Sequence, residues 1–284
     1  MTPILLVSLK LSVVALLLAI GMLTTRKEIT YLWHRPKLLM RSLLAMYFLV
    51  PLVAILFVTL LPLAPGLELA VFVLAISAGA PLLPKKLMGL GSDEYVLSLV
   101  VTASILAIFT VPAWATALSP LFGRDSQLAP FEVAMVIAKS FLVPLAIGML
   151  FRRFFPAKAE LYADNILTVA GLVLIVSAVI LLGVNWLLLV KAGWLTLFAL
   201  AGLTLSALIV GHLMGGKEPG ERTALAVSCA TRHLGLAILV ASAAPGPKTA
   251  VFVAAYIVSS AIVSIPYLKW QGKVNITSAQ KASE

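Results

Sequence analysis

Charged residues are scarce in this sequence, and their scarcity excludes a soluble globule. Of the 284 residues, 11% are charged and 62% are hydrophobic, and the mean hydropathy is +1.10. A soluble domain usually carries about a quarter of its residues as Asp, Glu, Lys or Arg. So few charges could not cover the surface of a globule, and we therefore expect lipid to surround most of the chain.

Cysteines and the motifs of enzymes are also missing. The single Cys229 excludes an internal disulfide and a cysteine-rich metal site. The sequence has no glycine-rich phosphate loop, no His-Glu-x-x-His and no Gly-x-Ser-x-Gly, and its three histidines lie on separate segments without metal-ligand spacing. We therefore predict no enzyme activity, no cofactor and no bound metal.

Long apolar runs are what the sequence does contain. About 20 helical residues cross a hydrocarbon core about 30 Å thick, and a backbone in lipid must satisfy its own hydrogen bonds. The runs predict an all-α membrane protein with about nine transmembrane helices. These are expected at residues 3–23, 38–63, 67–83, 95–119, 130–151, 164–184, 186–213, 222–243 and 248–268.

The basic residues are distributed unevenly between the connections. Of the 21 Lys and Arg, fifteen lie in alternate connections and three, Arg124, Lys191 and Lys248, lie in the opposite ones. This bias is the positive-inside signature. It explains the net charge of +10 without nucleic-acid binding. It predicts a multi-pass plasma-membrane protein, in a bacterium the inner membrane, with its N-terminus outside and its C-terminus in the cytoplasm.

Two of the apolar segments are interrupted. Each is second from the end of its half of the chain, the third of four segments and the fourth of five. The two halves match if one helix is missing from the N-terminus. Paired interruptions at corresponding positions are typical of inverted-repeat transporters and mark their binding site. The third segment contains Gly79, Pro81 and Pro84, and the eighth contains Thr231, Arg232, His233 and Gly235 about a dozen residues into its span.

Several stretches resemble the bile acid:sodium symporter family. They are Ile20-Gly-Met-Leu-Thr24, His34-Arg-Pro-Lys37, Val143-Pro-Leu-Ala-Ile-Gly148 and the two interrupted segments, in that family's order and spacing. The resemblance implies two inverted five-helix repeats with two crossing broken helices, the family's first helix having no counterpart here. It places a first repeat of four helices at 1–121 with its broken helix at 67–91, a second of five at 130–271 with its broken helix at 222–243, and a cytoplasmic tail at 272–284.

The resemblance also locates the positions of the family's sodium ligands. The family's Ser-Asn pair aligns with Pro84 and Lys85 of this chain. The family's Ser and Thr, four residues apart on the next helix, align with Ser98 and Thr102. The family's Glu-x-x-x-Gln-Asn-Ser-Gly, aligned on Gly235, puts Ser228 at the carboxylate and Arg232, His233 and Leu234 at the next three positions.

These departures all change the charge in one direction. An acid is lost at Ser228, and Lys85 and Arg232 replace neutral oxygen donors. Two like charges about 4 Å apart repel by about 4 kcal/mol at an effective dielectric of about 20. A fixed cation can therefore stand where a sodium ion stood. We expect alternating-access transport of a small organic anion that does not require sodium, with the anion at Lys85, Lys86, Thr231, Arg232 and His233.

Other interpretations of these residues stay open. Lys85 and Lys86 could be interfacial anchors, whereas Arg232 lies ten residues, or about 15 Å of helix, beyond Arg222. His233 could be a packing residue or a proton carrier, and Ser98 and Thr102 could bond their own helix. The rival functions are a sodium-coupled symporter of organic anions and a non-transporting receptor or assembly protein on the same fold.

The predicted topology can be tested with fusion reporters. A reporter after Glu284 and one in the loop at 123–127 should lie on opposite sides of the membrane, the first in the cytoplasm, because of the fifteen-to-three bias. The measurement is alkaline phosphatase against fluorescent-protein activity at each site. Two reporters on the same side would contradict the topology.

Overall fold

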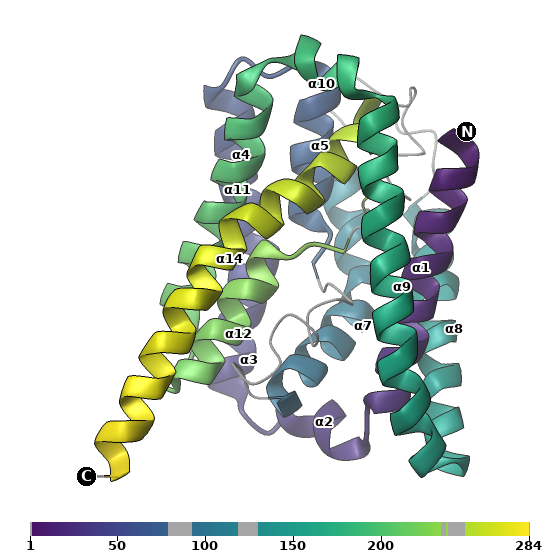
Figure 1. Cartoon of the computed structure of the whole chain (residues 1–284), viewed down its shortest axis with the longest axis vertical. Coiled ribbons are helices and arrows are strands. Elements are labelled where there is room, and N and C mark those ends of the chain that lie inside the picture. The colour runs from purple at the N-terminus through teal and green to yellow at the C-terminus, as the bar shows by residue number, and fades with distance from the viewer. Residues whose placement is uncertain (1, 79–92, 119–129, 234–236, 238–247, 284) are drawn as a thin grey trace.

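The computed structural model describes residues 2–78, 93–118, 130–233, 237 and 248–283. In these ranges the chain forms helices that run mostly along one long axis, with the two termini at opposite ends (Figure 1). The helices are α1 (Thr2–Leu23), α2 (Arg26–Tyr31), α3 (Pro36–Leu44), the π-helical segment η1 (Ala45–Leu49), α4 (Val50–Leu60), α5 (Pro65–Ile76), α7 (Asp93–Leu118), α8 (Pro130–Phe154), α9 (Pro156–Val184), α10 (Trp186–Ala192), α11 (Trp194–Met214), α12 (Pro219–Ala230) and α14 (Lys248–Ser283).

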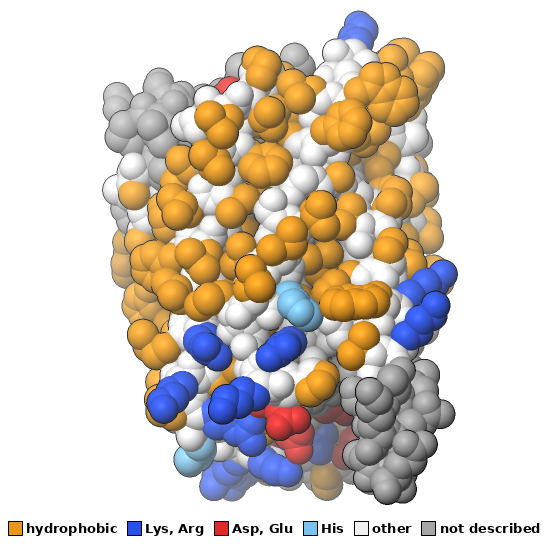
Figure 2. Space-filling view, turned by 90° about the vertical axis from the view of Figure 1, so that its left-hand side faces the viewer, with side chains coloured by type: hydrophobic (Ala, Val, Ile, Leu, Met, Phe, Trp, Pro, Cys, Tyr) orange, Lys and Arg blue, Asp and Glu red, His pale blue; other side chains and the backbone are white. Residues whose placement is uncertain are grey.

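Six stretches of helix in the described residues are long and apolar enough to cross a membrane, and α5 is a shorter apolar helix. The all-helical prediction of a multi-pass membrane protein is confirmed to that extent, and the number nine stays a prediction. The face drawn in Figure 2 is largely apolar, and most of the Lys and Arg side chains visible on it lie toward its lower end. The six stretches are Ile4–Leu23, Pro36–Leu60, Asp93–Trp114, Pro156–Val184, Trp194–Met214 and Val251–Val274.

Some helix bounds differ from those expected. The helix expected at 164–184 begins at Pro156, because proline is well suited to the first turn of a helix. The run 186–213 is divided between α10 and α11 at Gly193, whose φ of 74° suits glycine and few other residues. α14 continues to Ser283, through the residues expected to form a cytoplasmic tail.

Helices α1, α8 and α9 pack together as one group. The backbones of α1 and α8 touch at two glycines. A Cβ on Gly21 would lie 2.2 Å from the Leu145 carbonyl oxygen, and one on Gly148 would lie 2.1 Å from that of Leu18. Small residues at such crossings let membrane helices approach closely. Arg152 adds a polar link, because its guanidinium donates to the Met22 carbonyl at 2.9 Å and pairs with Glu160 at 3.0 Å.

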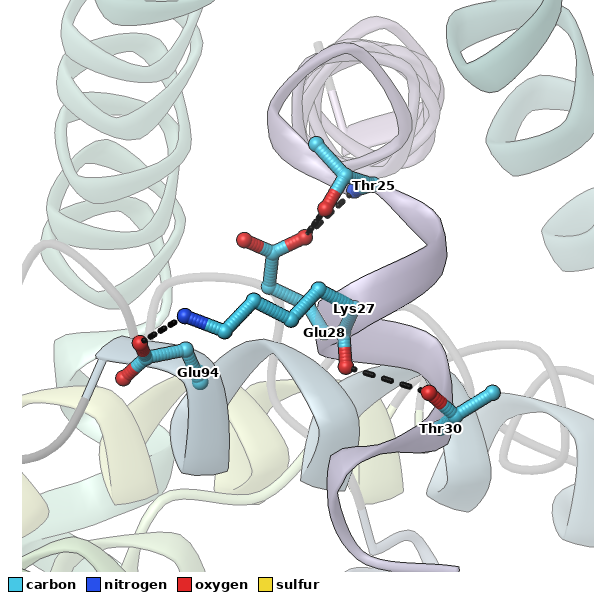
Figure 3. A network of polar contacts seen from close by, with 5 residues as sticks. All are labelled: Thr25, Lys27, Glu28, Thr30 and Glu94. Carbon is cyan, nitrogen blue, oxygen red and sulfur yellow. Dashed lines mark hydrogen bonds and ion pairs between the residues drawn. The ribbon is translucent and has the colours of Figure 1, made fainter.

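The short helix α2 connects α1 to α3 and is attached to α7. Its start is capped by Glu28, which accepts a hydrogen bond of 2.7 Å from the Thr25 backbone N–H. Lys27 Nζ lies 3.1 Å from Glu94 Oε1 at the start of α7 (Figure 3). Ser98, further along α7, accepts a hydrogen bond of 3.1 Å from the Leu32 N–H. The α2 segment is thus held on α7 by both of its ends.

Helices α4, α5, α11, α12 and α14 form a second packed group. Its closest approach is at Gly211 on α11, where a Cβ would lie 2.5 Å from the Ala226 Cα on α12. This contact fixes α12 along α11. Helix α7 contacts α8 of the first group and α5 and α12 of the second, and α14 of the second group contacts α9 of the first directly.

A proline explains the irregular helix before α4. Pro51 has no N–H to give the Tyr47 carbonyl four residues earlier, and the backbone adopts a π turn in which the Val50 N–H bonds to Ala45 instead. The orphaned Tyr47 carbonyl accepts a hydrogen bond of 3.0 Å from the indole Nε1 of Trp114 on α7. The Pro51 irregularity therefore ties α7 to the turn that carries Tyr47.

A double-mutant cycle tests this compensation. Trp114→Phe should lower the free energy of unfolding by about 1 kcal/mol, the usual size of a hydrogen bond between membrane helices. Pro51→Ala restores a backbone N–H that can donate to the Tyr47 carbonyl. In that background, Trp114→Phe should therefore lower the free energy of unfolding clearly less. The measurement is thermal or denaturant unfolding of the four proteins in one detergent. Equal costs in both backgrounds would contradict the proposed coupling.

Candidate functional site

Helix α5 ends inside the bundle because of a proline that follows it. The carbonyl of Ser77 would accept from residue 81 in a continued helix, and Pro81 has no N–H to donate. The backbone leaves the helix at Ser77, with φ −89° and ψ 68°. The Ser77 hydroxyl donates back to the Val73 carbonyl at 2.6 Å. The Ser77 carbonyl is therefore left to find a partner elsewhere in the protein.

Helix α12 enters from the opposite end of the molecule and stops at Ala230, near the middle of the long axis (Figure 1). Thr231 is extended, and the backbone N–H of His233 donates to the Ser77 carbonyl at 2.8 Å. The Tyr256 hydroxyl on α14 donates to the Ala230 carbonyl. Each irregular helix end thus has a backbone carbonyl satisfied by the other segment or by α14, in keeping with the need of a non-helical backbone in an apolar interior for partners.

Arg232 lies between these contacts and is buried. Its exposed fraction is 1%, yet none of its three guanidinium nitrogens has a hydrogen-bond partner among the described residues. A buried charge without partners is costly, by several kcal/mol per ion. The guanidinium is therefore a cation in need of an anion or of polar groups.

Only polar neutral groups surround this cation in the described part of the chain. The Tyr256 and Tyr47 phenols and the Cys229 thiol lie within electrostatic range of it. Tyr256 lies close by without hydrogen-bonding geometry. The buried carboxylate in the described ranges, Glu221, pairs with Arg35 at 2.7 Å instead. Among the described residues, no acidic side chain pairs with Arg232.

His233 and Thr231 are buried next to Arg232 on the same extended segment, with exposed fractions of 2% and 5%. The His233 ring meets the edge of Phe141 from α8, with centroids 4.3 Å apart and planes at 84°. Phe141 belongs to the other helix group, so the site lies where the two groups meet. The three buried residues expected to bind substrate in α12 and after it are thus adjacent in space as in sequence.

Three residues expected at sodium-ligand positions, Ser98, Thr102 and Ser228, lie in the described part of the chain. The Ser228 hydroxyl donates to the Ala224 carbonyl in its own helix at 2.6 Å. The Ser98 hydroxyl contacts α2 and the residue after it, accepting from the Leu32 N–H and donating to the Ile29 carbonyl at 3.4 Å. Thr102 is buried and its hydroxyl has no partner in the described ranges. No cluster of metal ligands occurs among the described residues.

Several predicted site residues lie outside the described residues. They are Gly79, Pro81, Pro84, Lys85, Lys86 and Gly235. Of the expected crossing of the two broken helices, the described residues include only the edge, where His233 meets Ser77. The half-helix ends described at the crossing are carbonyl ends, whose partial negative charge stabilises the Arg232 cation. Arg232 is the buried cation of this region in the described part of the chain.

Sequence analysis missed the aromatic residues of the site. Tyr47, Phe141 and Tyr256 come from three helices and are brought together by the fold alone. A weak signal existed for the two tyrosines, because a phenol in an apolar span needs a hydrogen-bond partner. The signal for Ser77 was stronger, because it lies four residues before Pro81 and its carbonyl therefore lacks a helical hydrogen-bond donor.

Comparison with known sequences identifies the family of this chain. No curated protein matches the chain. A sequence profile of the sodium bile acid symporter family matches residues 10–191, well over half of the chain, and ends before Arg232. The chain therefore belongs to the sodium bile acid symporter family.

Proposed function

We propose that this protein is a secondary transporter of a small organic anion. The family supports membrane transport, and the observation that carries the anionic substrate is Arg232, buried and unpartnered next to the Ser77–His233 hydrogen bond. An anion bound there would gain a charge-assisted hydrogen bond that is stronger for being out of water. It would also compensate the charge of the only cation buried in the described ranges.

The proposed mechanism is alternating access. The group α1, α8 and α9 would move against the group that contains α5, α12 and α14. The crossing of α5 and α12 would be the crossing of two broken helices in an inverted repeat. Phe141 against His233 is the contact between the two groups at this point, so a substrate beside Arg232 would be reached from either side as that contact changes.

We propose further that transport does not require sodium. Sodium prefers oxygen ligands, and the family's carboxylate position holds Ser228, whose hydroxyl is bound within its helix. The adjacent Arg232 would repel a sodium ion by about 4 kcal/mol at about 4 Å and a dielectric of about 20. Proton coupling through His233 is compatible with this proposal.

One observation favours the rival, a sodium-coupled symporter. The buried Thr102 hydroxyl has no partner in the described ranges, and an orphaned oxygen of this kind could coordinate a cation. Thr102 alone offers one ligand, whereas hard cations need several oxygens. The rival therefore depends on backbone carbonyls, and the transport assay below separates the two.

Substitution of Arg232 tests the site. Arg232→Met should raise the thermal stability of the ligand-free protein, because it removes an unpaired buried charge that costs about 3 kcal/mol. The same substitution should abolish the stabilisation that organic anions give the wild type. The measurement is the melting temperature in detergent with a panel of carboxylates and sulfonates that includes a bile acid.

The control is Lys191→Gln, which removes an exposed charge on α10. It should leave both the ligand-free melting temperature and the anion effect unchanged. Arg232→Lys, which keeps the charge, should retain part of the anion effect. A less stable Arg232→Met protein that still responds to anions would show that Arg232 has a structural role.

Uptake into liposomes tests the coupling. The anion that stabilises the protein most should enter at the same rate in sodium, potassium and choline buffers at one pH. The measurement is uptake of the radiolabelled anion. Uptake in sodium buffer alone would support the sodium-coupled symporter instead. Binding without any uptake would indicate a receptor on this fold.

A further inference from the structure

Two arginines are brought together at the end of the molecule opposite the N-terminus. Arg41 on α3 and Arg222 on α12 both contact the Gly215–Gly216 turn after α11. Arg222 Nε donates to the Gly216 carbonyl at 3.0 Å, and Arg41 Nη1 lies 3.5 Å from the Gly215 carbonyl. The turn fits closely, because a Cβ on Gly215 would lie 2.5 Å from the Arg222 Cα.

The charge of this pair is not balanced by the acids nearby. Both side chains are exposed, and neither forms an ion pair in the described part of the chain. Glu221 is paired with Arg35. The exposed Glu218 offsets one charge, and the exposed Lys217 restores it. Two positive charges therefore remain uncompensated beside one turn.

An aromatic cluster lies next to the pair on the faces of α11 and α14. His212 Nδ1 and the Tyr267 hydroxyl share a hydrogen bond of 2.9 Å, and Gln271 Nε2 lies 3.4 Å from both. Trp270 packs on this pair, with its ring centroid 5.7 Å from His212 and 5.9 Å from Tyr267, and is 52% exposed. Arg222 is within electrostatic range of His212, and Gly215, which packs against Arg222, follows His212 by three residues. The cluster therefore lies near Arg222.

The cluster marks the boundary between apolar and polar surface. His212 and Trp270 lie within one to two turns of the ends of the candidate spans Trp194–Met214 and Val251–Val274. Exposed Ile209 and Ile262 continue the same helices toward the middle of the membrane. Figure 2 shows Lys and Arg side chains gathered at this end of the molecule, next to the apolar surface. Aromatic side chains with polar tips prefer this level of a bilayer.

We propose that Arg41 and Arg222 bind the phosphate of an anionic phospholipid whose glycerol region packs against the His212–Tyr267–Trp270 cluster. Guanidinium groups bind phosphate oxygens through paired hydrogen bonds, and basic pockets between membrane helices recognise anionic headgroups. On the predicted topology the lipid belongs to the cytoplasmic leaflet. A soluble anion would gain nothing from the apolar surface beside the arginines, which favours a lipid.

Native mass spectrometry of the full-length protein tests the proposal. The protein is titrated in detergent with phosphatidylglycerol or with phosphatidylcholine of the same acyl chains. Phosphatidylglycerol should bind about tenfold or more tightly than phosphatidylcholine. The double variant R41Q/R222Q should weaken phosphatidylglycerol binding about 25-fold, at about fivefold for each arginine.

The matched control is R153Q/K158Q, which removes two exposed charges from the connection between α8 and α9. It should leave the affinity for phosphatidylglycerol unchanged, and an equal loss in both double variants would overturn the proposal. If R41Q/R222Q does not fold, R41Q alone should lose about fivefold. Equal affinity for the two lipids would also overturn the proposal. Displacement of the lipid by millimolar inorganic phosphate would overturn it too, because that would indicate a site for a soluble anion.

Discussion

The hydrogen bond from the His233 N–H to the Ser77 carbonyl is the contact on which the centre of this protein depends. Pro81 deprives the carbonyl of its helical donor, and the extended backbone after Ala230 deprives the N–H of its helical acceptor. A buried backbone group without a partner costs about 1–3 kcal/mol. Each segment therefore satisfies a group that the other leaves open, and neither irregular end would be stable in an apolar interior without the other.

This arrangement presents Arg232 to the interior at a cost in stability. The carbonyl ends of α5 and α12 offset part of the charge, and neutral phenols offset a little more. A residue kept at the expense of stability is typical of a binding site. The same reasoning separates Arg232 from Arg35, whose charge is balanced by Glu221. Two arginines near the same helix thus differ in that, among the described residues, only Arg35 has an acid beside it.

Sequence reasoning reached the parts of this structure that local chemistry determines. Apolar runs predicted helices, Pro81 predicted the end of α5, and the spacing from Arg222 predicted the burial of Arg232. It could not reach contacts between distant segments. Ser98 meets Leu32 across 66 positions, and Tyr256 reaches Ala230 only because α14 packs on α12. No local pattern encodes such a pairing, since it depends on how the helices pack.

The attachment of α2 to α7 has a mechanical consequence. α2 is bonded to α7 through Glu94 and Ser98, whereas α1 packs with α8 and α9 through the backbone contact at Gly21. The only non-helical residues between α1 and α2 are Thr24 and Thr25. A rotation of α1 relative to α7 must therefore be absorbed as dihedral change at these two threonines, which makes them the pivot of the first connection and limits the arc through which α1 can swing.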